Sequence, residues 1–132
     1  DKSLEDLALK FYKETFWDVN NLDKVSSQII AEELFDTGVN LGTGKAALFL
    51  QMALNALNKR GNIYPNIGED SSVGGNTLKA LDACIKYRGE SYILKIMNIL
   101  QGMHYIKRSR EDESQEKFMY GWLERVDFFK KQ

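Results

Sequence analysis

The chain has 132 residues and a mass of 15.2 kDa, which is the size of one domain with one hydrophobic core. Hydrophobic residues make up 43% and charged residues 28%, as in a globular rather than a disordered protein. The 18 Lys and Arg nearly balance the 19 Asp and Glu, which argues against a nucleic-acid binder that relies on phosphate neutralisation. One Cys excludes an internal disulfide, and one His leaves too few ligands for a structural zinc site.

The first half of the chain predicts three helices. Apolar residues recur at helical spacing from a capping Ser3 to Trp17. A polar break follows, in which Asp23 is predicted to cap a second helix that runs to about Val39. Two glycines at 42 and 44, both able to take positive φ, separate it from a third helix at 45–57.

The second half predicts three more helices after the longest irregular stretch, residues 58–75. This stretch holds the single Pro and is either a loop or a short hairpin around Ile63 and Tyr64. Helices are predicted at 76–87, at 90–108, and in a last segment that carries apolar residues from Phe118 to Phe129. The charged stretch 107–116 is predicted to be a solvated end or turn. The fold class is therefore all-α, and no apolar run approaches the ~20 residues that a membrane helix needs.

Two of these helices have unusual patterns. The third is apolar nearly all round, interrupted only by Gln51 and Asn55, so we expect it to be the buried centre of the fold. The second carries a polar line at i, i+4 and i+8, formed by Glu32, Asp36 and Asn40. Two carboxylates at this spacing repel each other, and this lowers the stability of the helix unless a partner or substrate binds them. The polar line is therefore either a candidate binding feature or a solvated stripe.

The aromatic and soft side chains divide into core and cleft candidates. We expect Phe11, Phe16 and Trp122 in the core, and Trp17 at the edge of a cleft, where an aromatic ring can stack on a sugar. Cys84 is expected to be a buried, inert thiol. His104 is expected to be a partly buried structural histidine.

Four segments of the sequence resemble glycoside hydrolase family 108, a group of bacterial and phage lysozyme-like proteins. The central string Leu34 to Gln51 (LFDTGVNLGTGKAALFLQ) is similar to its Asp…Val-Asn-x-Gly pattern with a following small-residue helix. The other three are FYKETFWD at 11–18, VGGNTLKAL at 73–81 and GWLERV at 121–126. Each motif is weak alone, but together they span nearly the whole chain in the family's order.

The resemblance also implies what lies outside the chain. Family members begin with a helix that ends in a Glu-Gly-Gly type motif, whose Glu is taken as the catalytic acid, and no such motif precedes Ser3. The implied general acid is therefore upstream of Asp1 or absent. The chain is expected to be a single domain, residues 1–132, in which 1–41 are the remainder of the lysozyme-like part and 42–132 a peptidoglycan-binding helical region. The chain begins at Asp1 without Met, which leaves open whether it is a mature form or part of a longer protein, and it has no visible signal peptide. The sequence leaves the localisation unknown, and the resemblance implies a protein that is made in the cytoplasm and acts on the bacterial cell wall.

The resemblance, together with the polar line, implies a substrate-binding role. Glycoside hydrolysis needs two carboxyl groups on opposite sides of the scissile bond, whereas Glu32 and Asp36 share one helix face, so no catalytic residue is assigned. The residues expected to contact peptidoglycan glycan strands are Trp17, Asp36, Asn40 and Gln51. No metal or organic cofactor is expected, and the chain is expected to be a monomer.

Two other functions remain open on the sequence. One is a non-catalytic module of the same fold that binds peptidoglycan or a secretion partner, since some relatives are described as secretion activators. The other is a helical protein-interaction domain that uses the aromatic final helix as its contact face.

Overall fold

A computed structural model describes residues 2–126 of the chain. These residues form six α-helices, four short helical turns and no strand, so the predicted all-α class is confirmed. The helices are α1 (Lys2–Tyr12), α2 (Gln28–Leu41), α3 (Thr43–Ala56), α4 (Gly75–Arg88), α5 (Glu90–Glu111) and α6 (Glu116–Arg125). No helix in this part of the chain is long and apolar enough to cross a bilayer.

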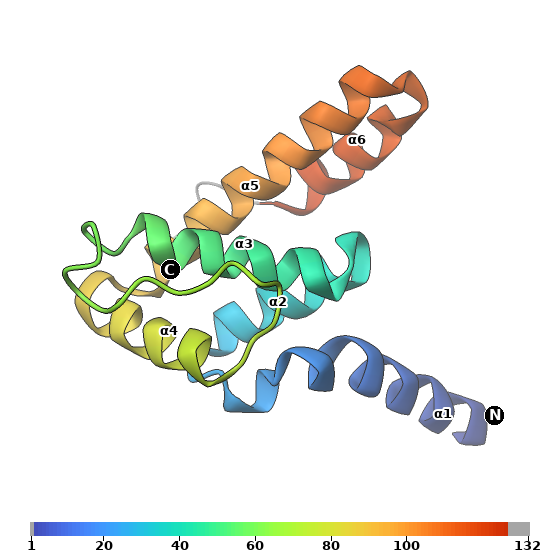
Figure 1. The fold of residues 1–132 in the computed structure, drawn as a ribbon. Coiled ribbons are helices and arrows are strands. Elements are labelled where there is room, and N and C mark those ends of the chain that lie inside the picture. Colours follow the sequence, from blue (N-terminus) through green and yellow to red (C-terminus); the bar gives the residue numbers. More distant parts are fainter. Residues whose placement is uncertain (1, 127–132) are drawn as a thin grey trace.

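Helix α3 is the buried centre of the fold, as its composition predicts. It packs against α2, α4 and α5 (Figure 1). Seven of its side chains are buried, because an apolar helix surrounded by neighbours on several sides removes most of its surface from water. They are Ala46, Ala47, Phe49, Leu50, Gln51, Ala53 and Leu54.

The turns around α2 and α3 differ in detail from the prediction. Asp23 does not cap α2, because its carboxylate accepts a hydrogen bond from the Trp17 indole N–H at 2.8 Å. Ser27 caps the helix instead, and its hydroxyl oxygen accepts from the Ile30 amide at 3.2 Å. Of the two glycines that are able to take positive φ, Gly42 does so, at 98°, whereas Gly44 lies within α3.

The long connection between α3 and α4 is a loop, and the alternative of a hairpin is wrong. Two asparagine side chains at the C-terminal end of α3 form the hydrogen bonds to the loop backbone that a partner strand would form in a hairpin. The Asn58 side chain bonds both the amide and the carbonyl of Tyr64, and the Asn55 side chain does the same to Ile67. The loop is thus held against α3 by side-chain amides.

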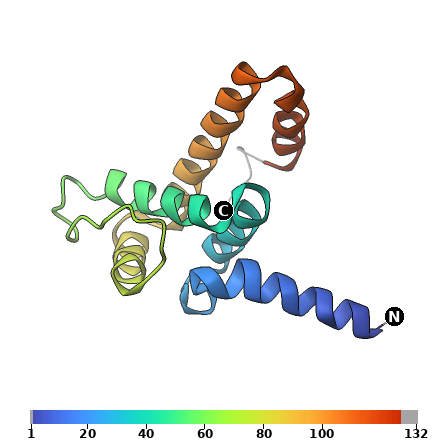
Figure 2. The ribbon, with the colours of Figure 1, turned by 45° about the vertical axis from the view of Figure 1, so that its right-hand side comes forward.

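Helix α1 projects from the body and buries no residue (Figures 1 and 2). The prediction of a core position for Phe11 is wrong, because its side chain is 57% exposed. Phe16, in the π-helical turn Lys13–Trp17, is half-buried and packs edge-on against Phe35 of α2. The predicted first helix therefore has the right length, but only its last turn touches the core.

Helix α5 begins within the core, where Ile93 and Met97 are buried, and its later part forms with α6 a hairpin that extends from the body (Figure 2). The predicted charged turn is partly helical, since α5 extends to Glu111, and the turn Glu113–Gln115 then joins it to α6. Trp122 is buried, as predicted, and its ring lies against Tyr105 at a centroid distance of 5.6 Å. Cys84 is also buried, and the prediction for Phe129 lies outside the described residues.

Candidate functional site

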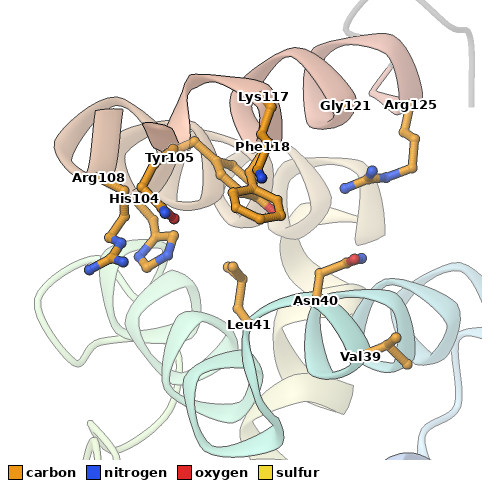
Figure 3. A pocket seen from close by; sticks show the side chains of 11 residues that line it. Val39, Asn40, Leu41, His104, Tyr105, Arg108, Lys117, Phe118, Gly121 and Arg125 are labelled. Carbon is orange, nitrogen blue, oxygen red and sulfur yellow. The ribbon is translucent and has the colours of Figure 1, made fainter. Parts of the chain in front are cut away.

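A groove lies between the C-terminal end of α2 and the α5–α6 hairpin. Its volume is about 520 Å³. Figure 3 shows Asn40 and Arg125 at one end of it, His104 and Arg108 at the other, and Phe118 between them. The lining residues are Val39, Asn40, Leu41, His104, Tyr105, Arg108, Gln115, Lys117, Phe118, Gly121 and Arg125.

The groove is cationic although the whole chain carries a formal charge of -1. Arg108, Lys117 and Arg125 line it and no carboxylate does. Among residues 2–126 the salt bridges are those of Lys10 with Glu14 and of Lys13 with Asp18, so none involves a groove cation. Cations gathered without carboxylate partners create a local positive potential that attracts anions.

The pKa of His104 is lowered by its environment in the groove. Burial is the largest cause, and the positive charges of Lys45 and Arg108 act in the same direction. A lowered pKa keeps the imidazole neutral at neutral pH. The half-buried His104 therefore offers a neutral, hydrogen-bonding ring at this end of the groove.

Aromatic side chains provide the apolar part of the lining. Phe118 is 51% exposed, so one face of its ring is available to a ligand. The ammonium group of Lys117 lies 5.2 Å from the centre of that ring. Tyr105 is buried beneath, where it packs against Trp122. The combination of an open ring, cations and the Asn40 amide suits a ligand that has apolar faces, hydroxyl or amide groups and negative charge.

The polar line of α2 ends at this groove. The Asn40 amide donates to the backbone carbonyl of Asp36 at 2.8 Å, and its oxygen remains available. Burial and the neighbouring Glu32 raise the pKa of Asp36, and Arg125 of α6 partly opposes them. Asp36 is thus within electrostatic range of the groove without lining it, whereas Asn40 lines it directly.

The other two predicted glycan contacts lie elsewhere. Trp17 is half-buried beside Phe35, at a ring distance of 5.9 Å, and its indole N–H is bonded to Asp23. Gln51 is fully buried. Its amide donates to Asp70, Ser72 and Thr77, and its oxygen accepts from the Ser71 amide. Gln51 therefore anchors the α3–α4 loop and exposes no atom to a ligand in this conformation.

One carboxyl group outside the groove is also perturbed. Burial between α2 and α5 raises the pKa of Glu33, an effect that a hydrogen bond from Gln101 partly opposes. Glu33 does not line the groove. Within the described range, no three His, Cys, Asp or Glu residues lie close enough to hold a metal ion.

Sequence reasoning missed most of the groove. The sequence places Arg108 in a solvated charge run and predicts a structural role for His104. Arg125 enters only as part of the GWLERV motif, and Lys117 carries no prediction. A weak signal was present, because Lys117, Gly121 and Arg125 recur every fourth residue and so share one face of α6. Nothing in the sequence shows that this face lies opposite the end of α2.

The described residues form an all-helical fold with a cationic, partly aromatic groove that no carboxylate lines. Residues 45–127 match the family described as a predicted peptidoglycan domain, and residues 2–42 match glycosyl hydrolase 108. The first match covers more than half of the chain, so the chain belongs to the predicted peptidoglycan domain family. No curated protein matches the chain significantly.

These matches confirm the resemblance drawn from the sequence motifs. The boundary between the two matches falls at residues 43–44, at the beginning of α3 and about one turn after Asn40, the last residue of the polar line of α2. They support a peptidoglycan-related role, as a hydrolase or as a binding protein.

Proposed function

We propose that this chain is the substrate-binding part of a lysozyme-like peptidoglycan hydrolase and that it binds peptidoglycan in the α2–α5–α6 groove. The observation that carries the proposal is the set of three cations, Arg108, Lys117 and Arg125, around the exposed ring of Phe118, with no carboxylate in the lining. Peptidoglycan combines sugars with carboxylate-bearing peptide stems, so its chemistry is complementary to this lining.

Each part of the groove has a role in such a complex. Guanidinium groups bind carboxylates with two parallel hydrogen bonds, which suits Arg108 and Arg125 to the acidic groups of the stems. The open face of Phe118 suits the C–H face of a sugar ring, and the Asn40 amide suits a hydroxyl or acetamido group. Asp36 acts beside the groove, through its electrostatic interaction with Arg125.

The general acid is proposed to come from a segment that precedes Asp1. Within the described chain, Glu32 and Asp36 share one face of α2, and the Glu33 carboxylate already accepts from Gln101. A pair of carboxyl groups across a glycosidic bond is therefore not formed by these residues. Helix α1 supports the proposal, because it exposes Leu4 and Leu7, at 66% and 63%, as an apolar face that such a segment can cover.

The alternative is a non-catalytic protein that binds peptidoglycan or a secretion partner. The absence of carboxylates from the groove lining favours it equally well. Whether the protein is an endolysin-like hydrolase or a binding module, we propose that it acts at the bacterial cell wall.

The test is to incubate this chain, and a version extended at its N-terminus, with insoluble peptidoglycan. Pellet binding and newly released reducing ends are measured for both. Release by the extended form alone supports a hydrolase with an upstream acid, and binding without release by either form supports the non-catalytic alternative. If neither form binds, the proposed function is wrong.

The groove is tested by the double substitution Arg108→Ala/Arg125→Ala. We expect pellet binding to fall by about 100-fold or more, since truncating a charged contact to a ligand costs roughly 1.5–3 kcal/mol and two such contacts are lost. The matched control is Lys79→Ala/Lys86→Ala, which removes two exposed cations of α4, outside the groove. Equal loss in both variants would show that binding follows total charge and does not use the groove.

A further inference from the structure

The three cations of the groove are spread along its length. Figure 3 shows Arg108 at one end and Arg125 at the other, with Lys117 between them. Lys117 and Arg125 lie on the same face of α6, two helical repeats of four residues apart, so about 12 Å of helix axis separates them. An extended peptide covers this length with about three or four residues. The groove therefore has the length of a short peptide, with an arginine at each end.

The middle of the groove is open. Gly121 lies midway between Lys117 and Arg125 on α6 and lines the groove. A Cβ atom at Gly121 would have Arg125 Nη1 at 3.5 Å and no other side chain of the described residues within 4 Å. The main chain of a ligand can therefore pass close to α6 between the two ends.

The charged side chains of the lining donate hydrogen bonds and accept none. Guanidinium and ammonium groups have no acceptor and a carboxylate has no donor, whereas a sugar hydroxyl is both donor and acceptor. One N–H of the Asn40 amide already bonds the Asp36 carbonyl at 2.8 Å, and the Asn40 oxygen is left to accept from a ligand N–H. This lining matches a peptide with free carboxylates better than a row of hydroxyl groups.

The two arginines are available to such a ligand. Within residues 2–126 neither forms a salt bridge. Asp36 interacts with Arg125 electrostatically, but it does not line the groove. Lys117 differs, because its ammonium group lies beside the Phe118 ring, 5.2 Å from the ring centre. Arg108 and Arg125 are therefore the principal anion-binding groups, one at each end.

In peptidoglycan, free carboxylates belong to the peptide stems. The lactyl carboxyl group of each stem-bearing sugar is consumed in the amide bond to the stem, so the glycan backbone at that point is uncharged. A glycan strand alone in the groove would take water away from two guanidinium groups without supplying carboxylates in return, which is costly. The cations thus favour the stem over the glycan.

We propose that the groove holds one peptide stem lengthwise along α6, with one stem carboxylate at Arg108 and another at Arg125. The glycan strand lies outside the groove, and only the sugar that bears the stem reaches the Phe118 ring. This inference rests on the proposed function, since it takes peptidoglycan as the ligand, and it names the part of the polymer that is recognised. Affinity then depends on the free carboxylates of the stem and falls when they are converted to amides.

The first test separates the polymer into its two parts. An amidase cleaves peptidoglycan into soluble stem peptides and stem-free glycan strands, and each is added as a competitor to wild-type chain bound to intact, insoluble peptidoglycan. We expect the stem peptides to displace the chain and the glycan strands not to do so. The glycan strands carry the lactyl carboxylates that the amidase releases, so they control for negative charge without a stem.

The second test removes the charge of the stems and keeps their shape. Insoluble peptidoglycan is coupled through its carboxyl groups to methylamine, which turns carboxylates into neutral amides. We expect the wild-type chain to bind the coupled polymer at least about tenfold more weakly than the intact one, because a charge-assisted contact contributes at least that factor.

The third test fills the middle of the groove without changing its charge. Gly121→Leu is expected to weaken pellet binding as severely as Arg108→Ala/Arg125→Ala. The matched control is Gly68→Leu in the α3–α4 loop, where an added Cβ atom has nothing within 4 Å. Circular dichroism verifies that both variants keep their helices, and the two polymer tests decide the matter with the wild-type chain if Gly121→Leu does not fold.

The outcomes separate this inference from the proposed function. Displacement by the glycan strands, displacement by neither competitor, or equal binding of the coupled polymer overturns the inference and leaves the proposed function in place. Undiminished binding by Gly121→Leu also overturns it, because a stem lying along α6 must pass this position. If the wild-type chain does not bind intact peptidoglycan, the proposed function itself is wrong.

Discussion

Replacing Gly102 by alanine tests whether close contact between α5 and α6 shapes the groove. A Cβ atom at position 102 would lie 2.9 Å from Cη2 and 3.3 Å from Cζ3 of Trp122. Carbon atoms pack best at about 3.5–4.0 Å, so the two helices must separate or the indole must move. Trp122 is only 6% exposed and packs against Tyr105, which leaves its ring little room.

Two opposing effects set the magnitude. Alanine is favoured over glycine inside a helix by about 1 kcal/mol, whereas overpacking a filled contact costs about 1–3 kcal/mol. Because the rigid ring fills this contact, we expect the clash to dominate, with a net loss of about 1–2 kcal/mol. For a chain of this length that loss lowers Tm by roughly 4–8 °C. A shift of α6 also moves Phe118 and Arg125, so pellet binding should weaken several-fold.

The control is Gly121→Ala on α6, where the nearest atom to an added Cβ is Arg125 Nη1 at 3.5 Å, an ordinary contact. This variant should be as stable as the wild type or slightly more so. In a Trp122→Phe background, the part of the indole that reaches Gly102 is gone, and Gly102→Ala should cost nothing. If Gly102→Ala raises Tm in the wild-type background, or if the double-mutant cycle shows no coupling, the contact does not constrain the hairpin.

Three further predictions concern the buried amide, the buried carboxyl group and the groove cations. Gln51→Leu should lower the free energy of unfolding by about 2–3 kcal/mol in urea titrations, because it leaves the α3–α4 loop without its anchor; an unchanged value would contradict this role. Glu33→Gln should stabilise the chain at about pH 7 but not at about pH 4. The raised pKa of Glu33 means that wild-type stability is lost as pH rises above the ordinary range of glutamate, and the glutamine variant has no such charge. Equal pH profiles would refute this. Peptidoglycan binding should weaken as salt increases, and the dependence should be smaller in Arg108→Ala/Arg125→Ala; an equal slope would place the ionic contacts elsewhere.

The sequence by itself determined the helices and the centre of the fold. The all-round apolar character of residues 45–57 made α3 the buried helix, because no other position removes so much apolar surface from water. Helical periodicity likewise placed α2, α4 and α5 to within a few residues. The burial of the Cys84 thiol followed from the apolar residues at helical spacing around it. These are local properties, and local periodicity encodes them.

The tertiary structure decided how those helices use their polar groups. Both Asp23 and Ser27 have side chains that are able to cap α2. Ser27 caps the helix, and the Asp23 carboxylate accepts a hydrogen bond from the Trp17 indole instead. Phe11 has the spacing of a core residue, yet it packs against the neighbouring rings of Tyr12 and Phe16 and stays 57% exposed. Periodicity shows that a helix has an apolar face but not whether a partner covers that face.

The groove depended most on tertiary structure. Asn40 comes from α2, Arg108 from α5 and Arg125 from α6, and their separation in the sequence carries no sign that they converge. Convergence follows from the packing of α5 against α2 and from the close approach of α6 to α5, where Gly102 meets Trp122. The chain as a whole is nearly neutral, whereas its packing brings three cations together around one aromatic ring. Net charge is a sum over all residues, but the charge of a site depends on which residues the fold brings together.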